Sequence, residues 1–293
     1  MSASRDIGVI TIVKNRIPQF YALLKSLEAS EHKPKELVVV WMTSPSSHSL
    51  VQSEHFPVKH CFSTTDSLPI AKARNRGAAA TNAATLLFLD VDCVIHPTLL
   101  TQVSTNVSRG TTIGSEMTEL KVIPEGAGYD EVSRLPESRE SRHSALQHKP
   151  KGLQSSLFAV SREDFDRVEG FDENYAGFGI GDIDFATRCN RVGITHRTLP
   201  LVTYKQYRQC RAYPLNHLLD IVSNANLYRN KWGYYPKTQW LTTFMARGFV
   251  NKSSVHAPLT VTRLPTVKEI RSAMAGIPVE AERHAENETR LSA

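Results

Sequence analysis

The first third of the chain alternates between short apolar runs and segments in which apolar residues recur at helical spacing. The β-branched run Ile7–Val13 predicts a strand, and the apolar positions of residues 20–27 predict the helix that follows it. The pattern continues with strands predicted at Glu36–Met42, Val58–Phe62 and Thr85–Leu89 and an Ala-rich helix predicted at Ile70–Thr81. This alternation indicates an α/β fold with a mostly parallel sheet and helices on its faces. Ligands of such sheets bind beyond the carboxyl ends of the strands, so the residues after Val13, Met42 and Leu89 are site candidates.

The middle of the chain has a weaker pattern. From Ser104 to Pro150 the apolar periodicity fades, and residues 125–151 are rich in Gly, Pro, Ser, Arg, Glu and His. We expect a long mobile loop there, because little of this segment can be buried. The next predicted elements are a strand at Gln154–Val160, a short helix at Arg162–Val168 and a helix at Asp182–Val192 that ends at Gly193.

The last third is predicted to be helical. Apolar residues of one face define an amphipathic helix over Pro214–Arg229: Leu215, Leu218, Leu219, Val222 and Ala225. An aromatic group follows at 232–236, with Trp240 beyond it, and we favour packing over sugar stacking as its role. Residues 279–293 are charged and are expected to fray.

Composition and charge narrow the class of protein. The 293 residues can form one large domain or two small ones, and a net charge of +6 favours anionic partners. Four cysteines without a CxxC pair indicate free thiols in a reducing compartment: Cys61, Cys93, Cys189 and Cys210. We find no apolar run of about 18 residues, no signal peptide and no nucleic-acid motif. We therefore expect a cytoplasmic protein with at most peripheral membrane contact and no nucleic-acid partner.

The sharpest chemical feature is a pair of carboxylates at the end of the strand predicted at Thr85–Leu89. Residues two apart on a strand point to the same side, so Asp90 and Asp92 converge where the apolar run ends. Two converging carboxylates repel each other and gain from a shared cation, and hard oxygen ligands suit Mg²⁺ or Mn²⁺. A divalent ion at this place would hold a diphosphate. The same spacing at Asp164 and Asp166 falls inside a predicted surface helix, where we expect both side chains to face solvent.

A second feature is the Gly-rich segment that leads into the helix predicted at Asp182–Val192. Four glycines within residues 170–181 allow the backbone to approach a ligand closely. Asp182 and Asp184 then lie in the first turn, where the helix dipole favours an ionised carboxylate. Such a carboxylate can act as a general base on an acceptor hydroxyl, and a plain N-cap explains Asp182 equally well.

Three segments together resemble the family 2 glycosyltransferases of the GT-A type, which have a Rossmann-like sheet. The segments are residues 7–27, residues 68–92 with Ala73-Arg74-Asn75-Arg76-Gly77 and Phe88-Leu89-Asp90-Val91-Asp92, and residues 170–188. The last one resembles the C-terminal galactosyltransferase-like motif. The resemblance covers most of residues 6–193 in the expected order.

The resemblance implies a UDP- or GDP-sugar donor, Mn²⁺ or Mg²⁺, and an inverting single displacement. Four residues fall where the family's first strand meets the nucleotide: Thr11, Val13, Asn15 and Arg16. Arg74 matches a contact to the base or phosphates, Asp92 a direct metal ligand, and Asp90 a contact to the ribose or donor sugar beside the metal. Asp182 matches the catalytic base.

The chain departs from the family pattern in three places: at the segment that recognises the base, in the galactosyltransferase-like motif, and at a metal-binding position. Residues 41–44 carry no acidic pair that would read the base, and Gly181-Asp182 stands where the family has Glu-Asp. Residues 202–207 lack the histidine that related enzymes use for metal binding, and Lys205 in this segment is a candidate to offset the diphosphate charge. His196, nearby in sequence, is interpreted as structural.

The resemblance divides the chain into a nucleotide-sugar-binding half at 1–103, an acceptor-side half at 104–212, a helical extension at 213–278 and a tail at 279–293. The acceptor is expected to be a carbohydrate or a glycolipid. Two alternatives stay open: a sugar nucleotidyltransferase, disfavoured because Val13-Lys14-Asn15-Arg16 has no glycine, and a protein that binds a nucleotide sugar without turnover.

Overall fold

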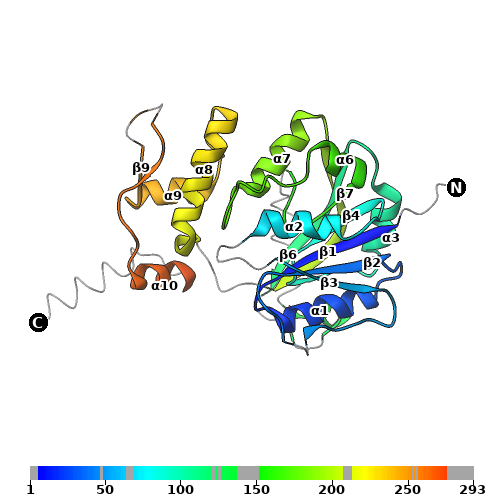
Figure 1. Cartoon of the computed structure of the whole chain (residues 1–293). Helices are drawn as coiled ribbons and strands as arrows, with labels where there is room; N and C mark the ends of the chain where they lie inside the picture. Colours follow the sequence, from blue (N-terminus) through cyan, green and yellow to red (C-terminus); the bar gives the residue numbers. More distant parts are fainter. Residues whose placement is uncertain are drawn as a thin grey trace, which may run out of the picture. The chain divides into compact units, whose positions relative to one another are not determined.

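The computed structural model describes residues 6–46, 49–63, 69–120, 123–124, 127–136, 152–206, 213–252, 254 and 257–275. The chain divides into two compact units (Figure 1). The first is Met1–Ala176 with Gly181–Gln206, and the second is Gly177–Ile180 with Tyr207–Ala293. In the described part of the chain, no helix is long and apolar enough to cross a membrane.

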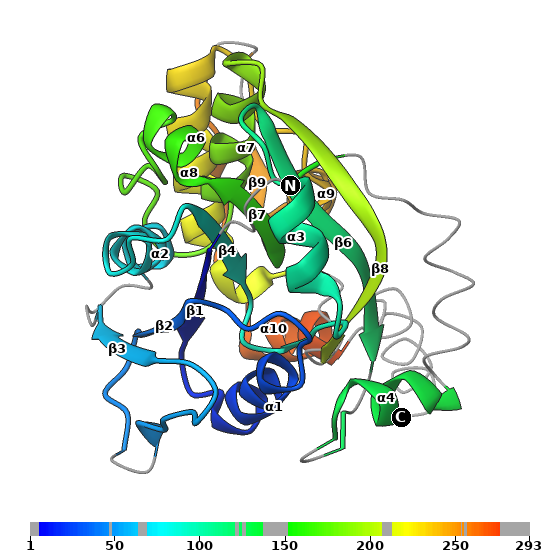
Figure 2. The ribbon, with the colours of Figure 1, turned by 90° about the vertical axis from the view of Figure 1, so that its right-hand side faces the viewer.

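The described residues of the first unit form an eight-stranded mixed sheet of order β3-β2-β1-β4-β7-β6-β8-β5. Its strands are β1 (Ile7–Val13), β2 (Glu36–Trp41), β3 (Val58–Phe62), β4 (Thr85–Leu89), β5 (Cys93–Val94), β6 (Thr111–Leu120), β7 (Leu157–Ser161) and β8 (Thr195–Gln206). The pairs among β1, β2, β3 and β4 are parallel, as is β6 with β8, whereas β7 is antiparallel to both of its neighbours. The predicted α/β fold with a mostly parallel sheet is confirmed, and the two long strands β6 and β8 curve together in Figure 2.

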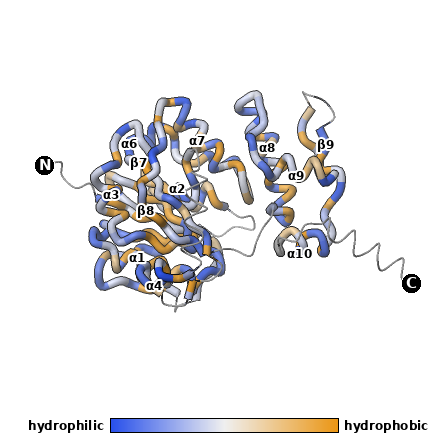
Figure 3. Tube along the Cα trace, turned by 180° about the vertical axis from the view of Figure 1, so that it is seen from behind, coloured by the Kyte–Doolittle hydropathy of each residue, from blue (hydrophilic) through white to orange (hydrophobic). Residues whose placement is uncertain are grey.

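Helices cover both faces of the sheet because its central strands are apolar on both sides. The helices that the described residues of this unit form are α1 (Ile17–Glu28), α2 (Ile70–Ala79), α3 (Leu99–Asn106), α4 (Tyr129–Arg134), α6 (Arg162–Arg167) and α7 (Gly181–Arg191). On β4, Leu87 and Leu89 belong to the core under α1 and α3, whereas Leu86 and Phe88 belong to the core under α2, α6 and α7. Figure 3 shows apolar residues collected along the strands. Asp90 therefore follows a strand that is fixed on both faces.

Two elements lie where the sequence predicts little buried structure. The expectation for residues 104–150 is wrong at β6 and at α4, and residues 137–151 of the predicted loop lie outside the described residues. β6 is polar in sequence, but it pairs along its whole length with β8, and Ser115 Oγ lies 2.7 Å from Thr203 Oγ1 in the interior. On α4, Tyr129 and Val132 are buried, and the Tyr129 ring packs 5.2 Å from that of Tyr204.

The described residues of the second unit form helices and a two-stranded sheet. Its elements are η2 (Leu215–His217), α8 (Leu218–Trp232), α9 (Gln239–Ala246), β9 (Val250–Asn251), β10 (Thr260–Val261) and α10 (Val267–Ala275). The predicted amphipathic helix is found as η2 and α8. Its predicted apolar face is wrong at Leu219, which is 58% exposed. The tail predicted at 279–293 lies outside the described residues, as does Cys210, while the other three cysteines are free thiols.

The contact between α2 and β1 depends on Gly77. A Cβ added to Gly77 would lie 2.4 Å from Ile10 Cγ2 and 3.1 Å from Val40 Cγ2. Gly77→Ala should therefore lower the free energy of unfolding by about 1–3 kcal/mol, in spite of alanine's higher helix propensity. Urea unfolding checks this value, with the same substitution in an Ile10→Ala background as the matched control, where the clash is relieved. Stabilisation of the wild-type background by Gly77→Ala would contradict this packing.

Candidate functional site

Asp90 and Asp92 lie in the turn between β4 and β5. The Asp90 backbone N–H donates to Ser156 O at 2.8 Å, and the Asp92 carbonyl accepts from Gln206 N at 2.9 Å. The turn is thus tied to the start of β7 and the end of β8. The Asp92 side chain is fully buried, and that of Asp90 keeps 20% of its surface exposed.

Lys205 brings an ammonium group to these two carboxylates. It lies on β8, paired with Cys93 of β5, and its Nζ is 2.8 Å from Asp90 Oδ2 and 4.0 Å from Asp92 Oδ1. Nζ also donates to Ser156 Oγ. Burial lowers the pKa of Lys205, but the charges of Asp90 and Asp92 outweigh it and raise the pKa above its ordinary value. The ammonium is therefore charged at neutral pH.

Arg74 and Asp182 form the second half of the cluster. Arg74 lies on α2 and is almost fully buried, and its Nη1 donates to Asp182 Oδ1 across 108 residues of sequence. Its Nη2 donates to Ser155 O at 3.2 Å and lies 3.9 Å from Asp90 Oδ1. Asp182 is in the first turn of α7, and its side chain is 37% exposed. The structure thus brings five predicted site residues together: Arg74, Asp90, Asp92, Asp182 and Lys205.

The residues around the two carboxylates fit a divalent ion poorly. Among the described residues, no group of three or more His, Cys, Asp or Glu side chains could hold a metal ion. Asp90 and Asp92 supply oxygen atoms of the kind that Mn²⁺ and Mg²⁺ prefer, but the Lys205 ammonium lies beside both. A protonated lysine carries no lone pair for a metal. His196 does not replace it, because it lies near the opposite end of β8, 3.0 Å from Thr112 Oγ1.

The four residues expected to meet the nucleotide lie at the carboxyl end of β1, beside β4 in the sheet. The side chains of Thr11 and Val13 are buried, and Val13 is part of the apolar core. Asn15 is exposed, has a φ of 52°, and accepts a hydrogen bond from Thr43 Oγ1 at 3.3 Å. Arg16 precedes α1 as its N-cap. Of these side chains, only those of Asn15 and Arg16 reach solvent.

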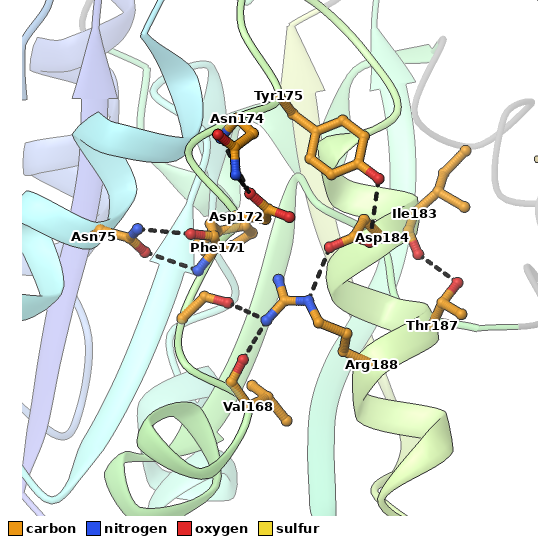
Figure 4. Close-up of polar contacts among 11 residues, drawn as sticks. Asn75, Val168, Phe171, Asp172, Asn174, Tyr175, Ile183, Asp184, Thr187 and Arg188 are labelled. Atoms are coloured by element: carbon orange, nitrogen blue, oxygen red, sulfur yellow. Dashed lines mark hydrogen bonds and ion pairs between the residues drawn. The ribbon is translucent and has the colours of Figure 1, made fainter. Parts of the chain in front are cut away.

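Asn75, the neighbour of Arg74, has a role that the sequence does not predict. Its side-chain amide donates to Phe171 O and accepts from Phe171 N, both at 2.8 Å (Figure 4). The amide also donates to Glu173 Oε1. The Arg74 guanidinium lies 5.1 Å from the centre of the Phe171 ring. α2 therefore holds the loop before α7 at the same place where Arg74 holds Asp182. The segment Ala73–Gly77 resembles the family motif, but that resemblance indicates a role only for Arg74.

Asp184 is a structural carboxylate, although it lies two residues from Asp182. It is fully buried, and its carboxylate accepts from Arg188 Nε at 2.8 Å and from Tyr175 OH at 3.2 Å (Figure 4). Arg188 Nη1 in turn donates to the carbonyls of Val168 and Gly170. This network fixes the start of α7, and so it sets the position from which Asp182 extends.

The Asp164 and Asp166 prediction is half wrong. Asp166 is exposed as expected, but Asp164 is fully buried. Its Oδ2 accepts from Gly110 N at 2.7 Å and from Ser161 Oγ at 2.9 Å, and its Oδ1 is 2.9 Å from Arg167 Nη2. Local hydrogen bonds at the start of α6 explain this burial, which helical spacing alone does not predict.

Two glycines of the Gly-rich segment have a packing role within the second unit. Gly177 has a φ of +71°, and a Cβ there would lie 2.4 Å from Asp220 Cγ. Gly179 has a φ of +84° and faces Ile221 of α8. The backbone of 177–180 is therefore close to α8, and Phe178 N donates to Asp220 Oδ2 at 3.1 Å.

Comparison with protein families gives two matches. A model described as glycosyl transferase family 2 matches residues 8–167, more than half of the chain. A model described as the N-terminal domain of galactosyltransferase matches residues 137–212. No curated protein sequence matches this chain.

Solved structures with a similar fold include three glycosyltransferases. GalNAc-T7 with UDP, GalNAc and Mn²⁺ has a TM-score of 0.50 and 17% identity over 71% of this chain, which covers only 45% of that protein. The mannosyltransferase PcManGT from Pyrobaculum calidifontis, with GDP-Man and Mn²⁺, has a TM-score of 0.55 and 16% identity, covering 80% of this chain and 67% of that one. TarS 1–349 from S. aureus with UDP-GlcNAc has a TM-score of 0.55 and 18% identity, covering 83% and 72%. At these identities the likeness shows a shared fold.

The Asp184 network should contribute strongly to stability. Asp184→Asn removes the charge that Arg188 pairs with in the interior, and we expect a loss of about 3–5 kcal/mol in the free energy of unfolding. Chemical denaturation measures this loss. Asp166→Asn is the matched control on an exposed helix position and should stay within about 0.5 kcal/mol of wild type. Equal effects of the two substitutions would contradict a structural role for Asp184.

Proposed function

The chain belongs to glycosyl transferase family 2, and from this we propose that it transfers a sugar from a nucleoside-diphosphate sugar to an acceptor hydroxyl. The observation that carries the proposal is the cluster beyond the end of β4 in which Arg74 contacts Asp90 and Asp182, while Lys205 contacts Asp90. This is the edge of the sheet where α/β proteins bind their ligands. UDP- and GDP-sugars are the proposed donors, which the complexes of PcManGT and TarS support.

The residues of the cluster divide the reaction between them. We assign to Asp182 the proton of the acceptor hydroxyl as its oxygen attacks the anomeric carbon. The bond from that carbon to the β-phosphate oxygen breaks, and its electron pair leaves with the nucleoside diphosphate, which gains negative charge. Arg74 and Lys205 are the cationic side chains placed to stabilise this charge. A single displacement of this kind inverts the configuration at the anomeric carbon.

The predicted Mn²⁺ or Mg²⁺ at Asp90 and Asp92 stays a prediction. The presence of Mn²⁺ in the structures of GalNAc-T7 and PcManGT supports it, and the Lys205 ammonium beside both carboxylates argues against it. When bound, such an ion neutralises the diphosphate charge.

We propose a carbohydrate or glycolipid acceptor. The predicted division into donor half, acceptor half and helical extension stays a prediction, as does a cytoplasmic location.

The second unit contains a cavity of about 520 Å³ lined by Tyr235, Pro236, Lys237, Thr238, Gln239, Leu241, Thr242, Met245, Lys252 and Leu259. The Tyr235 ring faces both the Arg229 guanidinium and the Lys252 ammonium. An aromatic wall with basic neighbours supports binding of a sugar, while the contacts of Tyr235 OH with Asn226 and Ala257 support packing.

A panel of nucleotide sugars tests the proposed function. A donor that binds should raise the melting temperature by mass action, by an amount that grows with its concentration. Stabilisation by at least one UDP- or GDP-sugar, followed by release of the nucleoside diphosphate with an acceptor, supports the proposal. Absence of stabilisation by every member, with and without Mn²⁺, would contradict it.

Asp182→Asn separates a base from a structural residue. Loss of the base should lower kcat by about 10²–10⁴-fold, because general base catalysis contributes that much. Donor affinity, measured by calorimetry, should change by less than about threefold, because the proton transfer occurs only in the reaction. Equal losses in turnover and donor affinity would assign Asp182 to structure alone.

A further inference from the structure

Lys205 is placed where a cation shared by Asp90 and Asp92 has to be. Its Nζ lies within 4.0 Å of an oxygen of each carboxylate, at 2.8 Å from Asp90 Oδ2 and 4.0 Å from Asp92 Oδ1. A metal ion that contacts both carboxylates would compete with the ammonium for the same space. The backbone fixes this placement, because Lys205 pairs with Cys93 in the sheet and Gln206 N donates to Asp92 O.

The cations of the cluster already offset most of its negative charge. Asp90, Asp92 and Asp182 bring three negative charges, and Lys205 and Arg74 bring two positive ones, as many as one divalent ion. Arg74 lies 3.9 Å from Asp90 Oδ1, and its side chain is 7% exposed, so solvent ions screen its charge little. A divalent ion added to this set would give it a net positive charge in a mostly buried site.

We propose that Lys205 and Arg74 take the place of the divalent ion and bind the diphosphate of the donor without a metal. The inference rests on the proposed function, since it concerns how the same site binds its donor. An ammonium has three N–H groups, and the hydrogen bonds of Lys205 to Asp90 and Ser156 use two of them. The third can donate to a phosphate oxygen. The Lys205 side chain keeps 16% of its surface exposed, which leaves it accessible to such a ligand.

The chemistry of the side chain at position 205 favours binding without a metal. A neutral histidine donates a lone pair to a metal, whereas a charged lysine has no lone pair and supplies a positive charge itself. Lys205 therefore brings a positive charge to Asp90 and Asp92 but no ligand for a metal ion.

Calorimetry of the wild-type chain with UDP and GDP tests the proposal without any variant. One titration is done in EDTA and one in Mn²⁺. We expect at least one nucleotide to bind in EDTA, with an affinity within about threefold of that in Mn²⁺, a difference of less than about 0.7 kcal/mol. Binding that requires Mn²⁺ would overturn the inference and leave the proposed function standing. Failure of both nucleotides, and of every nucleotide sugar, in both buffers would overturn the two together.

Two variants of Lys205 make the test sharper. Lys205→Met removes the charge and should weaken binding in EDTA by about tenfold or more. Lys205→His supplies a ligand in place of a charge, so we expect nucleotide binding that depends on Mn²⁺, together with loss of the free Mn²⁺ signal in electron paramagnetic resonance. Adding Asp92→Asn to Lys205→His should abolish that manganese binding. Manganese binding by the wild type that Asp92→Asn removes would overturn the proposal, whether or not the lysine variants fold.

Discussion

The electrostatic balance between two converging carboxylates and the cations beside them is the constraint on which the site depends. Asp90 and Asp92 are brought to one place by β4, a strand that is buried on both faces and cannot shift. Carboxylates held this way in a mostly buried site repel each other unless a cation joins them. In this chain Lys205 of β8 and Arg74 of α2 supply that charge, from elements far apart in sequence.

The same elements also hold the residues that would carry out the chemistry. Arg74 contacts both Asp90 and Asp182. One guanidinium therefore joins the carboxylate expected beside the donor to the carboxylate proposed as the base. Behind it, Asn75 fixes the backbone of Phe171, and Asp184 with Arg188 fixes the start of α7. The half-buried Asp182 is thus supported by a buried network. Such support is what a positioned carboxylate needs, because its geometry decides whether it can accept a proton.

Much of the fold could be predicted from the sequence, and the reason is local. β1 and β4 are apolar runs between turn residues, β3 has a weaker pattern, and the structure places all three at the predicted residues. The sequence does not predict β6, because buried residues of this strand are polar, as Ser115 is. The strand is held by its pairing with β8. The prediction that Leu219 is buried is wrong, because helical spacing alone does not show which edge of an apolar face packs against the rest of the protein.

The residues of the candidate site could be predicted from the sequence, but the contacts among them could not. Arg74, Asp90, Asp92, Asp182 and Lys205 all carried signals in the sequence, yet the distance between Lys205 and Asp90 depends on sheet order, which no local pattern contains. That distance places the Lys205 ammonium beside the two predicted metal ligands.

Anomalous diffraction at the manganese edge tests most directly whether Lys205 and Arg74 take the place of the metal, in crystals of the wild-type chain grown with a nucleoside diphosphate and Mn²⁺. We expect no anomalous peak between Asp90 and Asp92, and we expect the Lys205 ammonium in contact with a phosphate oxygen. A manganese peak bound by Asp92 and the diphosphate, with Lys205 displaced, would show that the site binds its donor through a metal.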